Sequence, residues 1–274
     1  MEARLAHPIF GALREALGRR LGDGLPDLEE LNAAAARAGL RVASGAALSF
    51  VAAPDDDENY ELRTYRSGCV ASRPGSLHDA FNALAWLAFP KTKARLNALH
   101  AAQIPLEGGR RGRFRDLLTI FDEGGAVIVC DDAELVGLVR GFRWRELFWE
   151  RRERVLASMR IHVLGHAVLE QALEPWPGIT CKALFVSSWD ADGRAAAWLA
   201  GLSRQATPQV LAPLPIFGYP GWFPGNDREA FYADERYFRP FRRDKITPGV
   251  GQAAAARNSA RAEESPGSTE RDAG

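Results

Sequence analysis

The order of helix and strand patterns along the chain is the feature that most constrains its fold. Apolar positions from Pro8 onward follow helical spacing, and Asp27 with Glu30 forms a capping-box pattern for a second helix that ends near Gly39. Short strand-like runs follow at residues 40–43, 47–52 and 60–66. Because strands and helices do not alternate regularly, we expect an α+β fold, with helices packed around a small mixed or antiparallel sheet, rather than a doubly wound sheet.

The middle of the chain predicts a helix, a hairpin and a long helix. Ser76 and Asp79 form another capping-box pattern, and Pro90 ends or kinks the helix that follows. Residues 117–121 and 126–130 flank an Asp-Glu-Gly-Gly turn, which predicts a β-hairpin because glycine tolerates the positive φ of tight turns. Helical character extends from about residue 144 to 173, and further elements are predicted as a helix at 93–102, a strand at 182–187 and a helix at 195–202.

The C-terminal part of the chain changes composition twice. Residues 213–224 are rich in proline, glycine and aromatic residues, so they cannot form a regular helix or a central strand, and we expect this segment to wrap over the domain. From about residue 243 the chain contains no aromatic residue to offset the entropy of ordering. We therefore expect one globular domain over residues 1–242 and a disordered tail over residues 243–274.

Charge and cysteine content restrict the classes of function. The chain has 274 residues, and its 35 Lys and Arg balance its 35 Asp and Glu, which argues against a dedicated nucleic-acid-binding protein. No apolar run is long enough to span a membrane, and the start does not show the pattern of a secretory signal. Three widely spaced cysteines are typical of a reducing compartment, so we expect a cytoplasmic protein. The expected partner is a small-molecule ligand, in keeping with the enzyme hypothesis below. The sequence gives no oligomeric state.

Histidines provide the first candidates for chemistry. On a helix, His78 and Asn82 share a face, so His78 could act as an acid, base or ligand with Asn82 orienting it or the substrate. His162 and His166 would also share a helical face, as metal binding requires, although the HExxH motif is absent. Both also continue an apolar stripe, so burial in the core explains them slightly better than metal binding does. Gly165 predicts close approach by another backbone or by a ligand.

Charged side chains provide further candidates. Asp122 and Glu123 would supply carboxylates if their turn folds over the His78 helix, although turn chemistry alone also explains them. The basic cluster at residues 110–115, with Arg115 at its end, favours anion binding over nucleic-acid binding. The sequence contains no GxSxG elbow, P-loop or GxGxxG motif.

Several blocks of the sequence resemble a proteobacterial family of uncharacterised proteins, a domain of unknown function. The most specific block is HDAFNALAWLAFPKTKARLN at residues 78–97, and later blocks lie at 115–123, 165–170, 213–222 and 231–240. The resemblance implies that residues 60–240 form one unit, but it implies no reaction. It groups the polar residues of the blocks as site candidates, which are His78, Asp79, Asn82, Asn97, Asp122, Glu123 and His166, and it ranks His166 above His162.

Two functional hypotheses follow. The first is an enzyme acting on a small molecule, with hydrolysis as the favoured reaction and with a divalent metal left open as cofactor. Its predicted catalytic residues are His78, Asn82, Asp122, Glu123 and His166, and its predicted ligand-binding residues are Arg115, Asn97 and Trp222. The second is a non-catalytic binding module that uses the segment 213–224. The enzyme hypothesis requires His78 to lie within about 10 Å of residues 122–123 or of His166.

Overall fold

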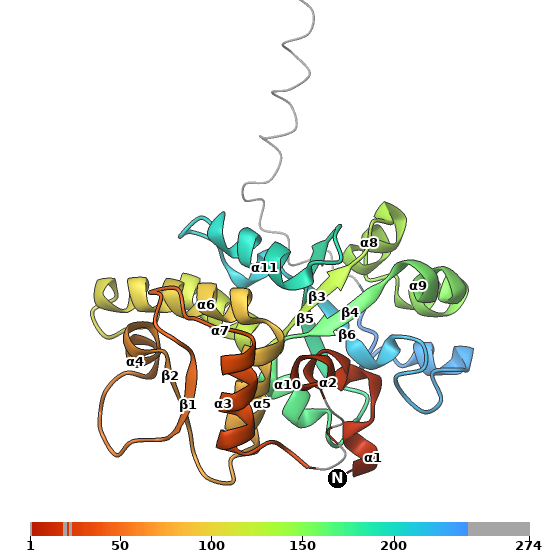
Figure 1. Cartoon of the computed structure of the whole chain (residues 1–274). Helices are drawn as coiled ribbons and strands as arrows, with labels where there is room; N and C mark the ends of the chain where they lie inside the picture. The colour runs from red at the N-terminus through yellow and green to blue at the C-terminus, as the bar shows by residue number, and fades with distance from the viewer. Residues whose placement is uncertain (1, 19–20, 22–23, 241–274) are drawn as a thin grey trace, which may run out of the picture. The chain divides into compact units, whose positions relative to one another are not determined.

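Helices surround a central four-stranded sheet in the computed structural model of the chain, which describes residues 2–18, 21 and 24–240 (Figure 1). The α-helices are α1 (Glu2–Leu5), α2 (Gly11–Leu17), α3 (Leu28–Arg37), α4 (Tyr60–Ser67), α5 (Leu77–Ala88), α6 (Pro90–Gln103), α7 (Arg113–Gly124), α8 (Ala133–Arg140), α9 (Arg152–Ser158), α10 (His166–Gln171) and α11 (Ala191–Ala200). The strands are β1 (Ser49–Ala52), β2 (Cys69–Ser72), β3 (Gly125–Val129), β4 (Arg160–Val163), β5 (Thr180–Val186) and β6 (Ala212–Pro215). A π-helical turn, η4 (Glu146–Glu150), precedes α9, and a 3-10 helix, η7 (Glu229–Ala233), lies near the end of the described chain.

The central sheet is mixed and has the strand order β4-β3-β5-β6. Strand β3 pairs in parallel with β5 and antiparallel with β4, and β6 completes the other edge antiparallel to β5. All five residues of β3 are buried, as expected for a central strand covered on both faces. Strands β1 and β2 form a separate parallel pair.

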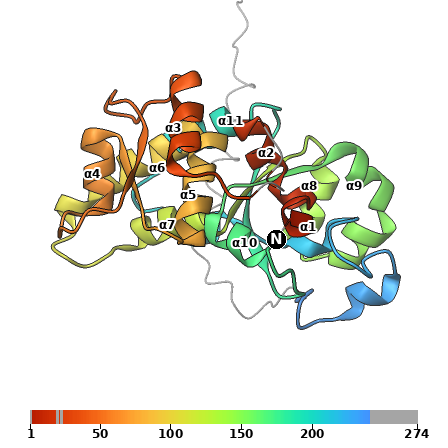
Figure 2. The ribbon, with the colours of Figure 1, turned by 60° about the horizontal axis from the view of Figure 1, so that its bottom comes forward.

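The two faces of the central sheet contribute to two apolar cores. Ala126 and Ile128 of β3 pack into the larger core together with α2, α5, α8 and the C-terminal aromatic residues. Val127 and Val129 point the other way and pack against α7 and α11. This alternation follows from the period of two in a strand. Helix α10 lies beside α5 in both views (Figures 1 and 2).

The segment rich in proline, glycine and aromatic residues wraps over the larger core, as the sequence predicts. Its first residues form the edge strand β6, where Pro213 and Pro215 are tolerated because one side of an edge strand needs no ladder hydrogen bonds. Phe217 and Trp222 are buried, and Asn226 donates hydrogen bonds to the backbone oxygens of residues 217 and 219. The segment therefore stabilises the fold through buried rings and a buried amide.

The predicted hairpin around residues 122–125 is wrong. Helix α7 continues through Asp122 and Glu123 to Gly124, because Phe114, Leu117, Leu118 and Phe121 give it one buried face. Gly125 has an extended backbone with φ −76°. Its lack of a side chain serves a close contact instead, since a Cβ atom there would lie 2.2 Å from the backbone oxygen of Phe121.

Two other predicted elements are also wrong. The predicted long helix at 144–173 is interrupted, because residues 160–163 form strand β4 along the edge of β3. His162 therefore lies on a strand, and His166 is the first residue of α10. The predicted strand at 60–66 is helix α4, which Asn59 caps at its start and Gly68 ends with a left-handed φ of 76°.

The fold class is α+β, as the sequence predicts. The described residues form one compact unit within residues 1–240. The predicted disordered tail at 243–274 lies outside the described residues. No described helix is both long enough and apolar enough to cross a membrane.

Candidate functional site

A cleft of about 420 Å³ lies between the first turns of α4, α5 and α10 and one side of α6 and α7. Polar side chains from all five helices line it, and they include Tyr60, Glu61, His78, Asp79, Asn82, His100, Arg115, Thr119, Asp122, Glu123 and His166, with Asn59, Arg73 and Arg111 on the adjoining loops. A smaller cavity of about 10 Å³ adjoins its floor and is lined in addition by Lys93 and Asn97. Such a concentration of acid–base groups in one cleft is the usual mark of a functional site.

Local sequence places two of the three histidines of the cleft, His78 and His166, at helix starts. Ser76 caps α5 by accepting a hydrogen bond from the backbone N–H of Asp79, which fixes His78 in the first turn. Gly165 precedes α10, and a Cβ atom there would lie 2.6 Å from the backbone oxygen of Glu123. The predicted close approach at Gly165 is thus confirmed, and it brings His166 against the end of α7.

His78 and His166 form a hydrogen-bonded pair. Their Nε2 atoms lie 3.0 Å apart, and their rings meet edge to face with centroids 4.5 Å apart. On the outer side, Nδ1 of His78 lies 3.0 Å from Oε2 of Glu170, which is one turn along α10 from His166. On the inner side, Nδ1 of His166 lies 2.9 Å from the backbone oxygen of Asp122. The four groups form one continuous chain of hydrogen bonds.

The partners at each end of this chain fix where its hydrogens lie. The backbone oxygen of Asp122 can only accept, so Nδ1 of His166 carries a hydrogen. Burial lowers the pKa of His166 to about 4, so the ring is neutral at pH 7 and its Nε2 carries a lone pair. Nε2 of His78 must then donate. Because Nδ1 of His78 also faces the Glu170 carboxylate, the arrangement with hydrogens on both nitrogens of His78 satisfies every contact.

Lys93 organises the floor of the cleft. Its side chain is only 4% exposed, and its Nζ donates to Oδ1 of Asp122 at 2.5 Å and to Oδ1 of Asn82 at 2.7 Å. The ammonium group also lies 5.6 Å from the ring centre of Trp86, within cation–π range. Burial acts to raise the pKa of Asp122, but Lys93 and the neighbouring histidines outweigh it and the pKa is lowered. Asp122 is therefore ionised at neutral pH and paired with a buried cation.

Glu61 is a second buried carboxyl group in the cleft. Its Oε2 accepts a hydrogen bond from Nδ2 of Asn97 at 2.7 Å. Burial and the nearby Asp122 carboxylate raise the pKa of Glu61 to about 7, although the Asn97 hydrogen bond partly opposes them. Beside it, the Tyr60 hydroxyl accepts from Nδ2 of Asn82 at 2.9 Å, and burial raises the pKa of Tyr60. The cleft thus contains one buried carboxylate held ionised, Asp122, and one buried carboxyl group, Glu61, that is about half protonated at pH 7.

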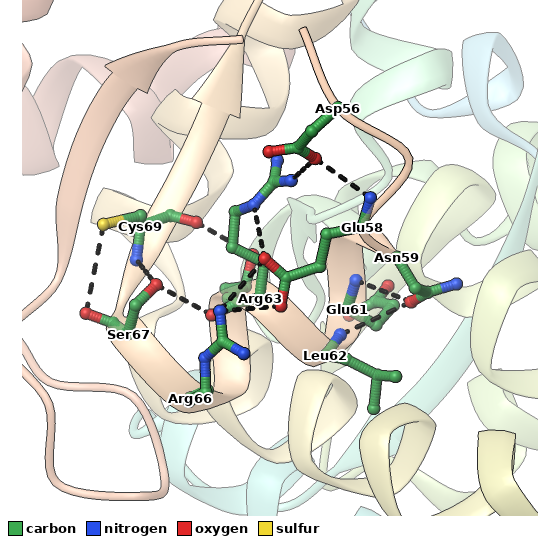
Figure 3. Close-up of polar contacts among 10 residues, drawn as sticks. Asp56, Glu58, Asn59, Glu61, Leu62, Arg63, Arg66, Ser67 and Cys69 are labelled. Atoms are coloured by element: carbon green, nitrogen blue, oxygen red, sulfur yellow. Dashed lines mark hydrogen bonds and ion pairs between the residues drawn. The ribbon is translucent and has the colours of Figure 1, made fainter. Parts of the chain in front are cut away.

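The loop before α4 fixes the position of Glu61. Figure 3 shows that Arg63 and Arg66 both contact the carboxylate of Glu58, which ties the loop to the helix. The side chain of Asn59 accepts a hydrogen bond from the backbone N–H of Glu61 at 3.0 Å (Figure 3). The first turn of α4, which carries Glu61, is therefore held by the cap of Asn59 and by the ion pairs of Glu58 with Arg63 and Arg66.

Basic side chains border the cleft at the start of α7. Nε of Arg115 donates to Nδ1 of His100 at 3.3 Å, and its Nη1 donates to Glu107 at 3.2 Å. Burial lowers the pKa of His100 to about 4, so this ring is neutral and accepts at Nδ1. Arg111 lies on the exposed rim and makes no hydrogen bond or ion pair with another described residue. Its guanidinium group is available to an anionic part of a ligand.

Most of the residues that the sequence singles out come together here. The cleft is lined by His78, Asp79, Asn82, Asp122, Glu123, His166 and Arg115, and Asn97 lines the small cavity on its floor. The requirement that His78 lie near His166 is met. Two details differ from expectation, because Asn82 contacts Lys93 and Tyr60 instead of His78, and Trp222 is buried in the larger core, outside the lining of the cleft.

Other residues of the site are missing from the sequence-based candidates. Glu170 lies four residues after His166, so helical spacing from a correctly placed α10 identifies it. The sequence-based candidates omit Glu61 because residues 60–66 are predicted as a strand, whereas they form helix α4. Lys93 and His100 lie on the predicted helix at 93–102, but no sequence signal shows that they are buried. No group of three or more His, Cys, Asp and Glu side chains with metal-binding geometry occurs in residues 2–18, 21 and 24–240.

Comparison with known proteins identifies a family but no activity. The family model described as a protein of unknown function, DUF3025, matches residues 48–242, a span that carries every helix of the cleft. Searches of curated proteins and of solved structures each gave no match. Because the family model covers more than half of the sequence, this chain belongs to the DUF3025 family.

Proposed function

We propose that this protein is an enzyme that acts on a small polar molecule by acid–base catalysis at His78 and His166, with hydrolysis as the favoured reaction. One observation carries the proposal, which is the 3.0 Å contact between the two Nε2 atoms inside a cleft. A chain of hydrogen bonds in which Nε2 of His78 donates and the Nε2 lone pair of His166 accepts places an acid and a base side by side.

The two histidines have different roles in this proposal. The side chain of His78 is 39% exposed, so its Nε2–H can turn from His166 to a substrate atom and act as the general acid. His166 is held by the backbone oxygen of Asp122, and its Nε2 lone pair, which faces Nε2 of His78, is exposed to a substrate when His78 turns away, so His166 acts as the general base. Glu170 orients the His78 ring through the contact of its Oε2 with Nδ1.

The surrounding polar groups position the reaction. The Lys93–Asp122 pair keeps α6 and α7 in register beneath His166, and Asn82 joins that pair to Tyr60. Arg111 provides positive charge at the rim, while Glu123 provides negative charge in the lining. A substrate with both an anionic group and a hydrolysable polar bond would satisfy this distribution of charge.

The alternative, a binding module built on residues 213–224, has less support. Trp222 is 8% exposed, and Phe217 and Tyr219 are buried with it in the larger core. A partner could reach these rings only after the segment left the domain. The cleft is therefore the better candidate for a ligand site.

The location of the protein forms part of the same proposal. Cys69, Cys130 and Cys181 are free thiols, which is consistent with a reducing cytoplasm. A small-molecule substrate also fits a cytoplasmic enzyme. Fractionation of cells with an antibody against the protein tests this placement.

Two near-isosteric variants test the proposal. In His166→Asn, the side-chain amide can still donate to the Asp122 oxygen, but it cannot accept a proton. In His78→Gln, the amide can still donate to His166, but it cannot act as an acid at neutral pH. Purified protein is screened against chromogenic esters, phosphoesters, glycosides and amides and against a metabolite extract, with and without added Zn²⁺ or Mg²⁺. We expect turnover to fall by about 10²–10⁴-fold in both variants, as for loss of a general acid or base.

His162→Gln is the matched control. His162 lies on β4, close in sequence to His166 but outside the lining of the cleft. It should retain wild-type turnover. Turnover that survives unchanged in both His78→Gln and His166→Asn would contradict the proposed roles.

A further inference from the structure

A second cavity, distinct from the histidine cleft, lies at the carboxyl ends of the two parallel strands. It has a volume of about 720 Å³, within the range of small-molecule sites. Strand β3 ends at Val129 and strand β5 at Val186, and the residues that follow each strand form the walls. These walls include Cys130, Asp131, Ser187, Ser188 and Trp189.

The path of the chain creates this cavity. Strand β3 continues into α8, which packs on the face of the sheet that belongs to the larger core. Strand β5 continues into α11, which packs on the opposite face, as Figure 1 shows. Where adjacent parallel strands send their connections to opposite faces, a crevice opens between the connections, and ligands of open α/β sheets bind in such crevices.

Trp189 provides a flat wall for a ligand. Its side chain is 76% exposed, the most exposed large apolar residue in the described part of the chain. The indole makes no ring contact or hydrogen bond with another described residue, whereas its backbone oxygen accepts from Ala191 at the start of α11. An exposed tryptophan in the wall of a cavity favours stacking with a planar ring.

The charge of the cavity determines what the ring should carry. Arg154 forms ion pairs with Asp132 and Glu134, so its guanidinium group is already occupied. Asp131 is exposed and has no hydrogen bond or ion pair with another described residue. The N-terminal N–H groups of α8 and α11 are capped by the side chains of Asp132 and Asp190, so an anion would meet carboxylates there. The lining of the cavity carries one guanidinium group and three carboxylates, those of Asp131, Asp132 and Glu134. This net negative charge favours a cationic ligand.

We propose that this crevice binds an aromatic amine, with the ring stacked on Trp189 and the ammonium group paired with Asp131. The site would be independent of the histidine cleft, because the two cavities share no lining residue. The aromatic amine bound there would be a regulatory or accessory ligand, or part of a second substrate.

Three probes of one size test the charge preference. Phenethylamine, phenethyl alcohol and phenylacetate are titrated into the full-length wild-type protein, and binding is followed by ligand-observed NMR. We expect saturable binding of phenethylamine and weaker binding of the other two. Trp189→Ala should weaken phenethylamine binding about two- to tenfold, the range that loss of an aromatic pair produces.

Matched surface variants serve as controls. Trp176→Ala removes another exposed tryptophan outside the cavity and should leave binding unchanged. Asp131→Asn should weaken phenethylamine binding and abolish its preference over phenethyl alcohol, whereas Asp57→Asn, on an exposed loop outside the lining of the cavity, should not. The proposal is overturned by absence of binding, by equal binding of all three probes, by a preference for phenylacetate, or by full binding in Trp189→Ala. Circular dichroism confirms that each variant is folded.

Discussion

Replacing Lys93 with methionine should destabilise the protein through the carboxylate that it leaves behind. Methionine has a similar length but removes the charge, so Asp122, only 19% exposed, loses its closest cation and Asn82 loses a donor. Breaking one partner of a buried ion pair costs about 3–5 kcal/mol. We therefore expect the free energy of unfolding, measured by urea denaturation at pH 7, to fall by about that amount.

A double variant separates the unpaired charge from simple loss of packing. In Lys93→Met with Asp122→Asn, no buried charge is left unpaired, so much of the lost stability should return. Lys91→Met is the control, because the Lys91–Asp190 pair is more than half exposed and should contribute less than about 1 kcal/mol. The reasoning is refuted if the single and double variants are equally unstable, or if Lys93→Met is no less stable than Lys91→Met.

The same variant has a defined pH dependence. In the wild type, burial acts to raise the pKa of Asp122, but Lys93 and the histidines outweigh it and the pKa is lowered. The ionised carboxylate therefore stabilises the fold above the unfolded pKa of about 3.9, and this stabilisation is lost on acidification. In Lys93→Met, burial dominates and raises that pKa. The stability difference between wild type and variant should therefore shrink as the pH falls toward 4.

Three further outcomes are expected. Burial raises the pKa of Glu61 from 4.5 to about 7, so between these pH values the folded state keeps a proton that the unfolded state releases, and the free energy of unfolding falls as the pH rises. In urea denaturation at pH 5 and pH 8, the free energy of unfolding of Glu61→Gln should therefore fall less with rising pH than that of the wild type. Gly165→Ala should lower the melting temperature measured by calorimetry, because its Cβ would lie 2.6 Å from the backbone of Glu123, and an unchanged melting temperature would contradict that contact. Trp222→Ala should cost about 3–5 kcal/mol in urea denaturation by leaving a cavity in the larger core, and a loss below 1 kcal/mol would show that its ring is not a core residue.

Local signals in the sequence predicted local structure well. The capping box of Asp27 and Glu30 is present with both of its hydrogen bonds. Ser76 caps α5 as expected, although the carboxylate of Asp79 binds Arg73 instead of completing a capping box. These features depend on residues within one helical turn, so a pattern read along the chain is sufficient to find them.

Elements that depend on distant partners were not predicted. Residues 160–163 form a strand because of ladder hydrogen bonds to β3, which lies more than thirty residues away. The local sequence pattern contains no sign of these hydrogen bonds and predicts a helix instead. The burial of Lys93 depends likewise on Asp122 and Asn82, which approach it from two other helices. Propensity and periodicity carry no information about such contacts, and tertiary context overrides them.

The histidine pair was predicted in part. His78 and His166 are 88 positions apart, so no spacing rule connects them, and resemblance to a family was the only signal that grouped them. The pairing of His162 with His166 was an artefact of the assumed helix. Once α10 is known to begin at His166, the helical spacing to Glu170 completes the set of groups around the pair.

The arrangement of hydrogens on the two rings tests the central claim most directly. Long-range ¹H–¹⁵N NMR of the histidine side chains at pH 7, assigned with His78→Gln and His166→Asn, distinguishes nitrogens that carry a hydrogen from those that do not. We predict a hydrogen on Nδ1 and a lone pair on Nε2 for His166, and hydrogens on both nitrogens of His78. A hydrogen on Nε2 of His166, with Nδ1 bare, would contradict the proposed acid–base pair.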